Sequence, residues 1–390
     1  MKTILHITAD YPDLYNERKT LAIRNLLQNT SGFRHLVYSI NRTSGLGGVQ
    51  LIGRQNDVTT ICYKAPPLGV FLETFLSGVA DWIVNDLQDA NEKVHLVHAH
   101  KLSIEGLVAQ RVSKTLGQLP YICTIRGNTD QKYLRLKLEK RAAYRQLVGG
   151  AELLLPVTPW IERYVDQTLG TDRAPKQLLP TISQRTELLS PQPGNGRLVT
   201  VFHLAGWRLK GIPNLLSAIS GLRAAGTLVQ LDIIGGGDEH HSQAIQKQIE
   251  KHDLDDQVRL IGAVPHTEIQ ARLNEYSGFV LPTLRETFGM VYIEALTAGL
   301  PIIYSEKRGV DGFFDDMNLG VRCDPKSVQS IEAALLRLTG NEPHMKAELA
   351  RFQAEGFFRR FNARNVSESY AAALQRILDR DRVTGSGEVR

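Results

Sequence analysis

Residues 282–296 read Pro282-Thr283-Leu284-Arg285-Glu286-Thr287-Phe288-Gly289-Met290-Val291-Tyr292-Ile293-Glu294-Ala295-Leu296. The apolar run Gly278 to Leu281 just before them predicts a buried strand, and the residues after Gly289 predict the start of a helix. The first N–H groups of a helix have no partner inside it. Together with the positive end of the helix dipole, they can bind phosphate oxygens. The stretch therefore predicts a strand, a loop and a helix start that can hold an anion.

Short apolar runs rich in β-branched residues alternate with longer helical stretches, and this alternation predicts parallel sheets covered by helices. One series of strands is expected at Thr3 to Thr8, His35 to Ser39, Val94 to His98, Tyr121 to Ile125, Leu153 to Val157 and Gln177 to Pro180. A second series is expected at Leu198 to Leu204, Val229 to Ile234, Val258 to Ile261, Gly278 to Leu281, Pro301 to Tyr304 and Gly320 to Cys323. The fold class is therefore α/β, with two doubly wound Rossmann-like domains.

The boundary between the two series is marked by Ser190-Pro191-Gln192-Pro193-Gly194-Asn195-Gly196, whose Pro and Gly content breaks helices and strands. A length of 390 residues also suits two domains better than one. We expect an N-terminal domain over residues 1–185 and a C-terminal domain over residues 186–364. Ligands of open α/β sheets bind beyond the carboxyl ends of the strands, so both substrates are expected in a cleft between two facing sheets.

The net charge of +5 is unevenly distributed. Residues 1–185 hold 23 Lys+Arg and 16 Asp+Glu, or +7, which leaves 23 against 25, or -2, for residues 186–390. A basic half suits an anionic membrane surface, an acidic acceptor or nucleic acid, and it is equally typical of a solvated face. The three scattered cysteines favour neither a disulfide framework nor a zinc cluster. No apolar run of membrane-spanning length and no secretion signal is visible, so a cytoplasmic protein is expected.

Glu286 and Glu294 lie eight residues apart, just over two helical turns, so both carboxylates could reach one elongated ligand. A carboxylate accepts hydrogen bonds from paired hydroxyls, as ribose and hexoses present them. Two such glutamates alone also fit a helix cap and an exposed helix residue.

In this context the chain resembles the retaining GT-B glycosyltransferases of family 4. The matching residues are Glu286-Thr287-Phe288-Gly289, Glu294-Ala295 and Gly299-Leu300-Pro301. The resemblance implies that Glu286 lies by the donor sugar and that Glu294 binds ribose hydroxyls. It also implies that the backbone of Thr287, Phe288, Gly289, Met290 and Val291 meets the donor diphosphate. The fold implied is the GT-B architecture, two Rossmann-like domains facing across a cleft.

Further parts of the second domain match the same family. Arg208 and Lys210, just after its first expected strand, stand where relatives place an Arg and a Lys against the diphosphate. Such cations offset charge that develops on the leaving group. The loops with Gly235 and Gly236 and with Val264 are used around the nucleotide in relatives. Together with a helix N-terminus, the cations imply a metal-independent site without a cofactor, and we read Asp379-Arg380-Asp381 as solvated charge rather than a metal motif.

The first domain matches less closely. His98-Ala99-His100 resembles a loop of the family, and His98 and His100 fit a core and a surface residue equally well. The segment from Cys123 to Asp130 stands where relatives have a histidine, a glycine and an aspartate, and here Arg126 replaces the histidine that contacts the donor sugar. An arginine could instead hold an anionic group through two hydrogen bonds. These four residues, His98, His100, Arg126 and Asp130, are candidates for the acceptor or sugar side.

The resemblance implies transfer of a hexose from a nucleotide-diphosphate sugar, with retention, to a glycan or lipid-linked acceptor in cell-surface polysaccharide or lipopolysaccharide synthesis. It also implies that a C-terminal helix, about 365–390, packs back on the first domain. Three alternatives stay open: hydrolysis or epimerisation of a sugar nucleotide, non-catalytic sensing of one, and nucleic-acid binding. The last is not expected, because no nucleic-acid-binding module and no interleaved aromatic residues on strands are visible.

A peripheral contact with an anionic membrane is a separate expectation. The basic stretch from Lys132 to Arg145 has apolar residues interleaved, as in helices that lie on anionic bilayers. Pro67 to Leu76 adds an apolar stretch that could enter the bilayer. A packed helix with a basic outer face explains the first stretch equally well.

Overall fold

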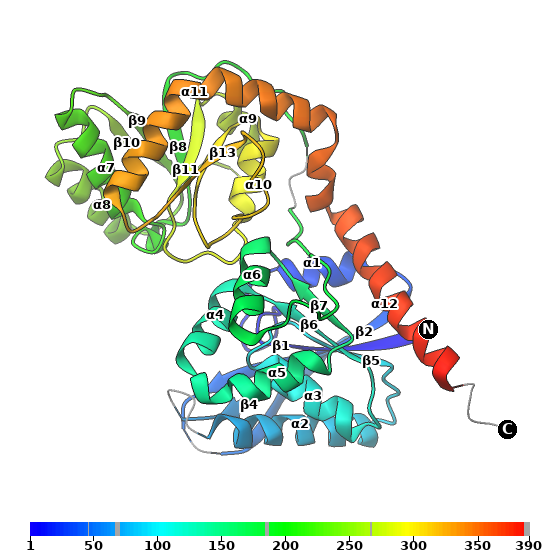
Figure 1. Ribbon diagram of the computed structural model, residues 1–390. Helices are drawn as coiled ribbons and strands as arrows, with labels where there is room; N and C mark the ends of the chain where they lie inside the picture. Colours follow the sequence, from blue (N-terminus) through cyan, green and yellow to red (C-terminus); the bar gives the residue numbers. More distant parts are fainter. Residues whose placement is uncertain (46, 67–70, 184–186, 266, 386–390) are drawn as a thin grey trace. The chain divides into compact units, whose positions relative to one another are not determined.

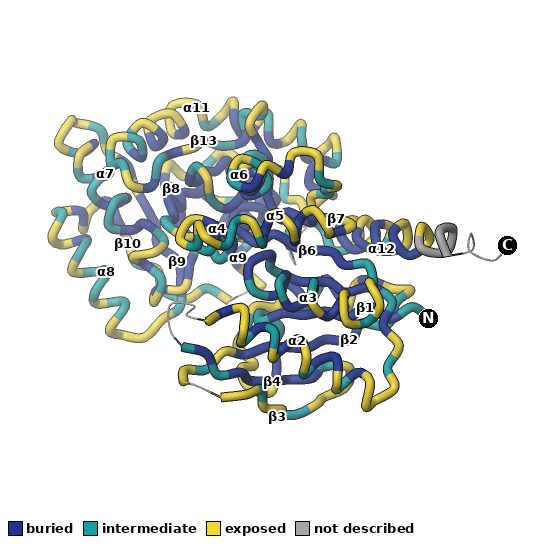
Figure 2. The backbone as a smooth tube through the Cα atoms, turned by 60° about the horizontal axis from the view of Figure 1, so that its bottom comes forward, coloured by how far each residue is buried: buried dark blue, intermediate teal, exposed yellow. Residues whose placement is uncertain are grey.

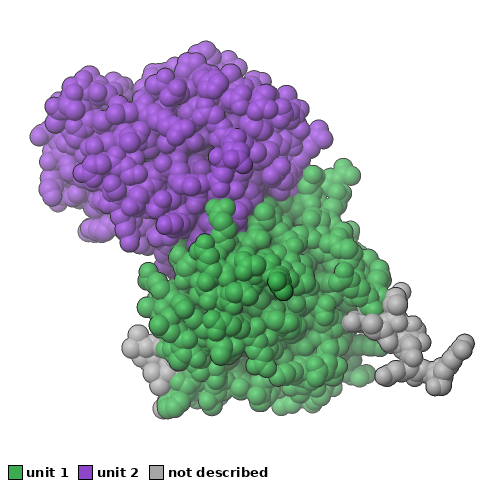
Figure 3. Space-filling view, in the orientation of Figure 1, with its two compact units in different colours: residues 1–157, 161–182, 363–390 green, residues 158–160, 183–362 purple. Residues whose placement is uncertain are grey.

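The structure is a computed structural model that describes residues 1–45, 47–66, 71–183, 187–265 and 267–385, with side chains described to residue 380. The chain divides into two compact units, which Figure 3 shows in different colours. Unit 1 comprises Met1–Val157, Ile161–Ile182 and Ala363–Arg390, and unit 2 comprises Thr158–Trp160 and Ser183–Asn362. Each unit has its own parallel sheet and its own buried core.

The sheet of unit 1 has the strand order β3-β4-β2-β1-β5-β6-β7. Its strands are β1 (Lys2–Thr8), β2 (Phe33–Thr43), β3 (Val49–Gln55), β4 (Val58–Lys64), β5 (Leu96–Ala99), β6 (Tyr121–Ile125) and β7 (Leu153–Pro156). All neighbours pair in parallel except β3 and β4, which are antiparallel. The central strands appear as buried tube in Figure 2, as expected for a parallel sheet covered on both faces.

Helices connect these strands (Figure 1). They are α1 (Ala22–Asn29), α2 (Leu72–Asp89), α3 (Glu105–Thr115), α4 (Gly127–Leu136), the short η2 (Leu138–Lys140), α5 (Arg141–Gly149), α6 (Pro159–Leu169) and the terminal α12 (Ala363–Gly385). The terminal helix α12 packs against α1 and places Tyr370 and Leu374 in the core of unit 1. The last residues of the chain thus belong to the same unit as the first.

In unit 1 one strand prediction is wrong, and two strands were not predicted. The hairpin strands β3 and β4 were not expected; β3 is largely exposed, including its apolar residues Leu51 and Ile52. The segment Gln177 to Pro180, which was expected to be a strand, runs beside β7 but forms only an isolated bridge between Leu154 and Lys176. Pro180 has no N–H group with which to extend the ladder.

The sheet of unit 2 has the order β10-β9-β8-β11-β12-β13, with every pair parallel. Its strands are β8 (Arg197–Val201), β9 (Gln230–Ile234), β10 (Val258–Gly262), β11 (Gly278–Leu281), β12 (Ile302–Ser305) and β13 (Gly320–Cys323). This is the doubly wound order, in which the chain reverses direction of growth between the first and fourth strands. The switch point lies between β8 and β11, so a ligand site is expected beyond their carboxyl ends.

Seven helical segments belong to the described part of unit 2: η3 (Leu204–Gly206), α7 (Ile212–Ala224), α8 (Glu239–Lys251), α9 (Ile269–Asn274), α10 (Met290–Thr297), α11 (Val328–Ala354) and η4 (Phe357–Phe361). Helix α11 packs on α7 and on β13. The core includes the fully buried β11 and most of α10, which fixes the position of the loop between them.

The expected linker Ser190 to Gly196 is part of unit 2 rather than a free connection. Its backbone N–H groups donate to unit 2 acceptors, Gly194 N to Glu342 Oε1 at 3.0 Å and Gly196 N to Ser277 Oγ at 3.0 Å. Asn195 N donates to Glu275 O at 3.0 Å. The Pro and Gly residues therefore mark an irregular segment that packs on the unit, and the chain divides earlier, at residues 182/183.

The basic stretch Lys132 to Arg145 is not one continuous helix. Helix α4 ends at Leu136, η2 follows, and α5 begins at Arg141. Leu134 and Tyr144 are buried, whereas Leu136 and Leu138 are 58% and 59% exposed. The expected apolar stretch Pro67 to Leu76 lies partly outside the described residues. Among the helices that are described, none combines the length and the apolar character that crossing a membrane requires.

Candidate active site

A pocket of about 580 Å³ lies in unit 2 at the switch point of its sheet. It is lined by Val201, Phe202, His203, Lys210, Ile234, Gly235, Gly236, Ala263, Val264, Ile269, Glu286, Gly289, Met290, Val291 and Glu294. These residues come from the ends of β8 and β9, the segment after β10, the start of α9, the loop before α10, and α10 itself. The stretch 282–296 therefore forms one wall of the pocket, and the glycine loop after β9 forms another.

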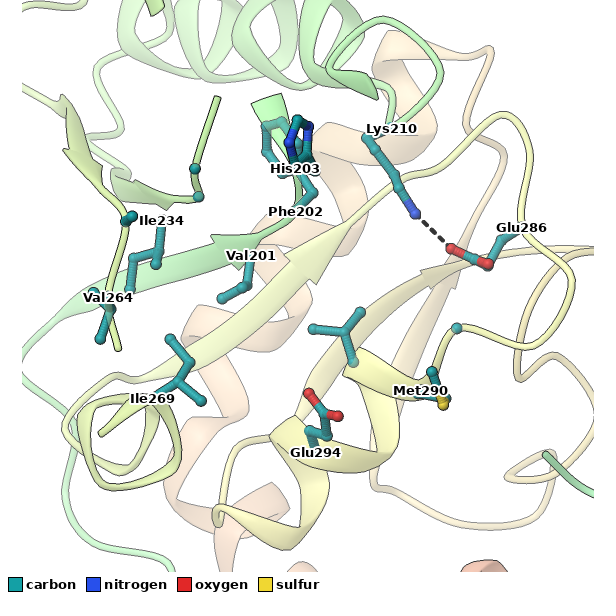
Figure 4. A pocket seen from close by; sticks show the side chains of 15 residues that line it. Val201, Phe202, His203, Lys210, Ile234, Val264, Ile269, Glu286, Met290 and Glu294 are labelled. Atoms are coloured by element: carbon teal, nitrogen blue, oxygen red, sulfur yellow. Dashed lines mark hydrogen bonds and ion pairs between the residues drawn. The ribbon is translucent and has the colours of Figure 1, made fainter. Parts of the chain in front are cut away.

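Lys210 and Glu286 face each other at one end of the pocket (Figure 4). The Lys210 Nζ lies 2.6 Å from Glu286 Oε2, and the two side chains are 26% and 17% exposed. Leu284 N donates to Leu209 O at 2.8 Å, which fastens the lysine loop to the loop before α10. The other carboxylate oxygen of Glu286 accepts from Thr287 N at 3.1 Å. Glu286 is therefore held in one orientation, with its charge balanced by Lys210.

Gly289 is required by the backbone at the start of α10. Its φ is 79°, in the left-handed region, and a Cβ built there would lie 2.6 Å from Tyr292 Cδ2 and 3.1 Å from Glu286 Cγ. Met290 and Val291 are the first helical residues, so their N–H groups have no acceptor within α10. Both residues line the pocket, which places the positive end of the helix dipole against it.

Glu294 lies one turn after Met290 on α10 and lines the same pocket. Figure 4 shows the apolar side chains Ile234, Val264 and Ile269 on the far side of the pocket from the pair of Lys210 and Glu286. The pocket thus has a charged end, a helix N-terminus with a carboxylate one turn away, and an apolar end.

The glycine loop after β9 is shaped by close packing. A Cβ on Gly235 would lie 1.9 Å from Phe202 O, so only glycine allows the ends of β8 and β9 to approach this closely. Leu204 N donates to Gly236 O at 2.9 Å across the same two segments. Gly235 and Gly236 line the pocket as expected, and Gly235 has a packing reason of its own.

Three residues of the expected site are not among the residues that line the pocket. The Arg208 guanidinium stacks on the ring of Trp207, 4.3 Å from its centroid, and is not among the described lining residues. The Phe288 side chain is buried against Phe313 and Phe361. Thr287 contributes its N–H to Glu286 and does not line the pocket either. The spacing of the charged residues in the sequence does not indicate that the Arg208 guanidinium stacks on Trp207.

His98 and His100 are both core residues, so the alternative that one of them lies at the surface is wrong. Both imidazoles are fully buried in unit 1. His98 Nδ1 pairs with Tyr370 OH at 2.6 Å and His98 Nε2 with Thr124 Oγ1 at 2.7 Å, so both its ring nitrogens are occupied. The physical reason is that β5 is a central parallel strand, buried on both faces.

The imidazoles of His6, His98 and His100 come together closely enough to hold a metal ion, with ligand atoms within 4.8 Å of one another. His6 Nδ1 and His100 Nε2 already pair at 3.0 Å. Burial lowers the pKa of each of the three well below its usual value, and the nearby charge of Arg126 adds to this for His98 and His100. Neutral rings that hydrogen-bond to each other and to hydroxyls explain the cluster without an ion.

Asp130 holds two loops of unit 1 together. Its carboxylate accepts from Ser103 N at 2.9 Å and from Arg126 N at 2.7 Å, and it is fully buried. Burial raises the pKa of Asp130, and the two backbone N–H groups act in the opposite direction. Asp130 therefore positions the backbone of Arg126 and of Ser103, and each of its carboxylate oxygens already accepts a hydrogen bond.

Sequence reasoning missed several lining residues of the pocket: Val201, Phe202, His203, Ile234, Ala263 and Ile269. Most of them directly follow or end a strand, which was the available signal, since loops beyond strand ends carry the site. His203 is the polar member, and its Nδ1 accepts from Ala205 N at 3.4 Å.

Comparison with known proteins identifies this part of the chain. Residues 192–353 match the family described as Glycosyl transferases group 1. This segment is a glycosyl transferases group 1 domain. The whole of the pocket, from Val201 to Glu294, lies within the group 1 domain.

Relatives also match by sequence, and two of them show the extent of the match. A glycogen synthase of Mycobacterium tuberculosis is 32% identical over 126 residues, which cover 32% of this chain and 30% of that protein. The amylovoran biosynthesis glycosyltransferase AmsK of Erwinia amylovora is 27% identical over 258 residues, covering 61% of this chain and 60% of that protein. The matched segments thus span less than two thirds of either relative.

The fold of the chain is similar to that of a solved sucrose-phosphate synthase from Thermosynechococcus elongatus. The TM-score is 0.67 at 18% identity, over 97% of this chain and 100% of that one. At this identity the likeness shows the fold, the GT-B architecture with two Rossmann-like α/β units. The expected fold class is confirmed by this likeness and by the two parallel sheets.

Proposed function

We propose that this protein is a glycosyltransferase that binds a nucleotide-diphosphate sugar in the pocket of its group 1 domain. It transfers the hexose, with retention, to a glycan or lipid-linked acceptor in the synthesis of a cell-surface polysaccharide or lipopolysaccharide. The observation that carries the proposal is the order of chemical groups along the pocket. An apolar end, a carboxylate, a helix N-terminus and a charged pair follow one another in the order that such a donor requires.

Each part of the donor is matched by a different group of the residues that line the pocket. The base lies among Ile234, Val264 and Ile269, and the ribose hydroxyls donate to Glu294. The diphosphate accepts hydrogen bonds from the N–H groups at the start of α10 and meets Lys210. The hexose then reaches Glu286, which Lys210 holds in place.

Lys210 also supplies the chemistry of the leaving group. When the bond between the sugar and the diphosphate breaks, negative charge develops on the phosphate oxygens, and a cation already aimed at them stabilises it. Lys210 and the helix N-terminus provide that field, so we propose that transfer needs no divalent metal. The Arg208 guanidinium stacks on Trp207 and is not needed in this scheme.

The alternative is hydrolysis or epimerisation of the sugar nucleotide in the same pocket. Both reactions use the same donor contacts and need no acceptor. Product analysis with and without an acceptor glycan separates the three reactions, because only transfer gives a longer glycan.

Contact with an anionic membrane belongs to the same proposal. Leu136 and Leu138 are exposed beside Lys140 and Arg141, a combination suited to anionic lipid headgroups. Co-sedimentation with phosphatidylglycerol vesicles, and none with phosphatidylcholine vesicles, is the expected result. Binding that is unchanged in Leu136→Ser/Leu138→Ser would remove this part of the proposal.

The test of the donor site is thermal stability with a panel of UDP-, GDP- and ADP-sugars, followed by a transfer assay with the best of them. A ligand that binds only the folded protein raises its melting temperature. We expect one base to give a clear rise in the native protein and little rise in Glu294→Ala, whose ribose contact is lost. Glu239→Ala, on the first turn of the outer helix α8, is the matched control and should behave as the native protein. A panel without any rise, or an equal rise in Glu294→Ala, would contradict the proposal.

A further inference from the structure

In the part of unit 1 that the structure describes, one buried guanidinium, that of Arg126, has no hydrogen-bond or ion-pair partner. Arg126 follows β6 and precedes α4, so it lies at the carboxyl end of β6. The residue is only 9% exposed, and its Nε is buried without a hydrogen-bond partner. Among the described residues no side chain or carbonyl forms a hydrogen bond or ion pair with the guanidinium. Its backbone N–H, by contrast, is held by Asp130.

The nearby carboxylates do not pair with the guanidinium, and all but Glu105 Oε2 of the oxygens named here have other partners. Asp10 Oδ2 lies 2.7 Å from Lys101 Nζ, and Glu105 Oε1 accepts from Ala9 N at 2.7 Å. Both oxygens of Asp130 accept backbone N–H groups. A guanidinium keeps its charge in proteins, and a buried charge without a partner is costly. A ligand that supplies the missing negative charge would remove that cost.

Three more polar atoms without partners lie on the neighbouring segments. They are Glu105 Oε2, Ser103 Oγ and His100 Nδ1, all buried. The strands involved, β1, β5 and β6, are adjacent in the sheet, and the Asp130 carboxylate ties the Ser103 loop directly to Arg126. Native proteins pair nearly all their buried polar atoms, so four in one region indicate a place for a polar ligand.

We propose that unit 1 carries a subsite for an anionic hexose, centred on Arg126. The guanidinium binds a carboxylate or phosphate group through two parallel hydrogen bonds, the geometry that arginine favours. Hydroxyls of the same sugar pair with Glu105 Oε2, Ser103 Oγ and His100 Nδ1. The inference rests on the proposed function, because the sugar bound here is either the acceptor or the hexose of the donor.

The unpaired charge of Arg126 makes a neutral hexose a poor ligand for the proposed subsite. A sugar that brings only hydroxyls would leave the guanidinium buried and unpaired, whereas a uronate or a sugar phosphate pairs it. Specificity then follows from the penalty on the wrong ligand as much as from contacts with the right one.

The first experiment measures binding of glucuronate, glucose 6-phosphate and glucose to the full chain by saturation-transfer NMR. We expect at least one of the two anionic sugars to bind about tenfold or more tightly than glucose, as an added charge-assisted pair provides. Arg126→Met should abolish the preference. Arg126→Lys should retain part of it for the phosphate and lose it for the carboxylate, because lysine lacks the planar fork. Equal binding of all three sugars by the native protein would overturn the proposal.

The melting temperature of Arg126→Met distinguishes a ligand-binding role of Arg126 from a packing role. If Arg126 is kept for a ligand, Arg126→Met removes an unpaired buried charge and raises the melting temperature of the ligand-free protein. If Arg126 only packs, the variant melts lower and keeps the ligand preference of the native protein, which would also overturn the proposal.

Two further arms identify the source of the anion and protect the test from failure of the proposed function. Tighter binding of UDP-glucuronate than of UDP-glucose, lost in Arg126→Met, assigns the anion to the donor. Binding of free glucuronate in the presence of UDP assigns it to the acceptor. Glu294→Ala should lose nucleotide binding and keep glucuronate binding, so a wrong nucleotide site would leave the anion subsite measurable.

Discussion

In the proposed donor site Lys210 already has a partner, Glu286, which a bound donor would have to displace. Its ammonium lies 2.6 Å from Glu286 Oε2, so an incoming diphosphate competes with a carboxylate for the same cation. Exposed ion pairs contribute little, and this pair is about a quarter exposed on the lysine side. A doubly charged diphosphate can therefore displace the Glu286 carboxylate from Lys210.

This competition gives opposite expectations for the two partners. Glu286→Gln should bind the nucleoside diphosphate more tightly than the native protein, by a few-fold, because Lys210 is released from its carboxylate. Its transfer rate should fall, since Glu286 is proposed to lie at the hexose. Lys210→Ala should lower kcat by about 10²- to 10³-fold, the range for loss of one charge-stabilising group, and raise KM less.

Calorimetry with the nucleoside diphosphate and steady-state kinetics with the donor sugar check both variants. Arg208→Ala is the control, because its guanidinium stacks on Trp207 and does not line the pocket. An unchanged kcat in Lys210→Ala would show that the lysine only binds the donor.

At the scale of elements, the loop between β11 and α10 is the part that the sequence described best. The buried run before it, the glycine and the apolar residues of α10 are all local signals, and the strand, loop and helix begin where they were expected. The same holds for the second sheet as a whole, since buried parallel strands are continuous apolar runs.

What could not be predicted depends on neighbours that lie far away in the chain. The β3–β4 hairpin forms by strand pairing, and its strand β3 is largely exposed. Arg208 is an exception, because the tryptophan on which it stacks is its neighbour in the chain. For His98 and His100 the sequence left a core and a surface position equally open, and the sheet buries both of them. The lining residues Ile234, Val264 and Ile269 meet only when β9, β10 and α9 assemble.

Gly289 provides the test at this scale. Gly289→Ala places a Cβ 2.6 Å from the ring of Tyr292 and forces a left-handed backbone on alanine, which costs about 1 to 2 kcal/mol before the steric contact is added. We expect a lower melting temperature and weaker nucleotide binding. Gly340→Ala in α11 is the matched control, because a Cβ there meets nothing within 4 Å, and it should be neutral or slightly stabilising. Equal nucleotide binding by both variants would contradict the requirement for glycine at the start of α10.

At the scale of the whole molecule, the two units differ in how they bury titratable groups. Unit 1 holds His6, His98 and His100 fully buried, and burial lowers the pKa of each well below 6.5. The folded state then binds fewer protons than the unfolded state below that pH. The stability that depends on these neutral rings is therefore present above pH 6.5 and is lost as the pH falls through 6.5 and below. Each ring costs about 1.4 kcal/mol per pH unit in that range.

The buried carboxyls of unit 1 have the opposite effect on the pH dependence of stability, and there are fewer of them than buried histidines. Burial raises the pKa of Glu105 to about 7, so its contribution is fully present below 4.5 and is lost as the pH rises through 7. Asp130 is shifted in the same direction. Three imidazoles outweigh these two groups, so we expect unit 1 to lose stability between pH 7 and pH 5 before unit 2 does.

Hydrogen exchange, corrected for its intrinsic dependence on pH, measures this for peptides of each unit. Peptides from β1, β5 and β6 should lose protection at pH 5.5, while peptides from β9 and β11 keep it. Simultaneous loss in both units, or earlier loss in unit 2, would contradict the assignment of buried neutral histidines to an acid-sensitive unit.

The central claim is that the pocket of the group 1 domain is the donor site, and a crystal structure of the protein with a nucleoside diphosphate tests it most directly. We expect phosphate oxygens within hydrogen-bond distance of the Met290 and Val291 N–H groups and of Lys210 Nζ. We also expect ribose hydroxyls at Glu294 and the base among Ile234, Val264 and Ile269. A nucleotide bound outside this pocket, or bound in it with the phosphates at the apolar end, would contradict the account.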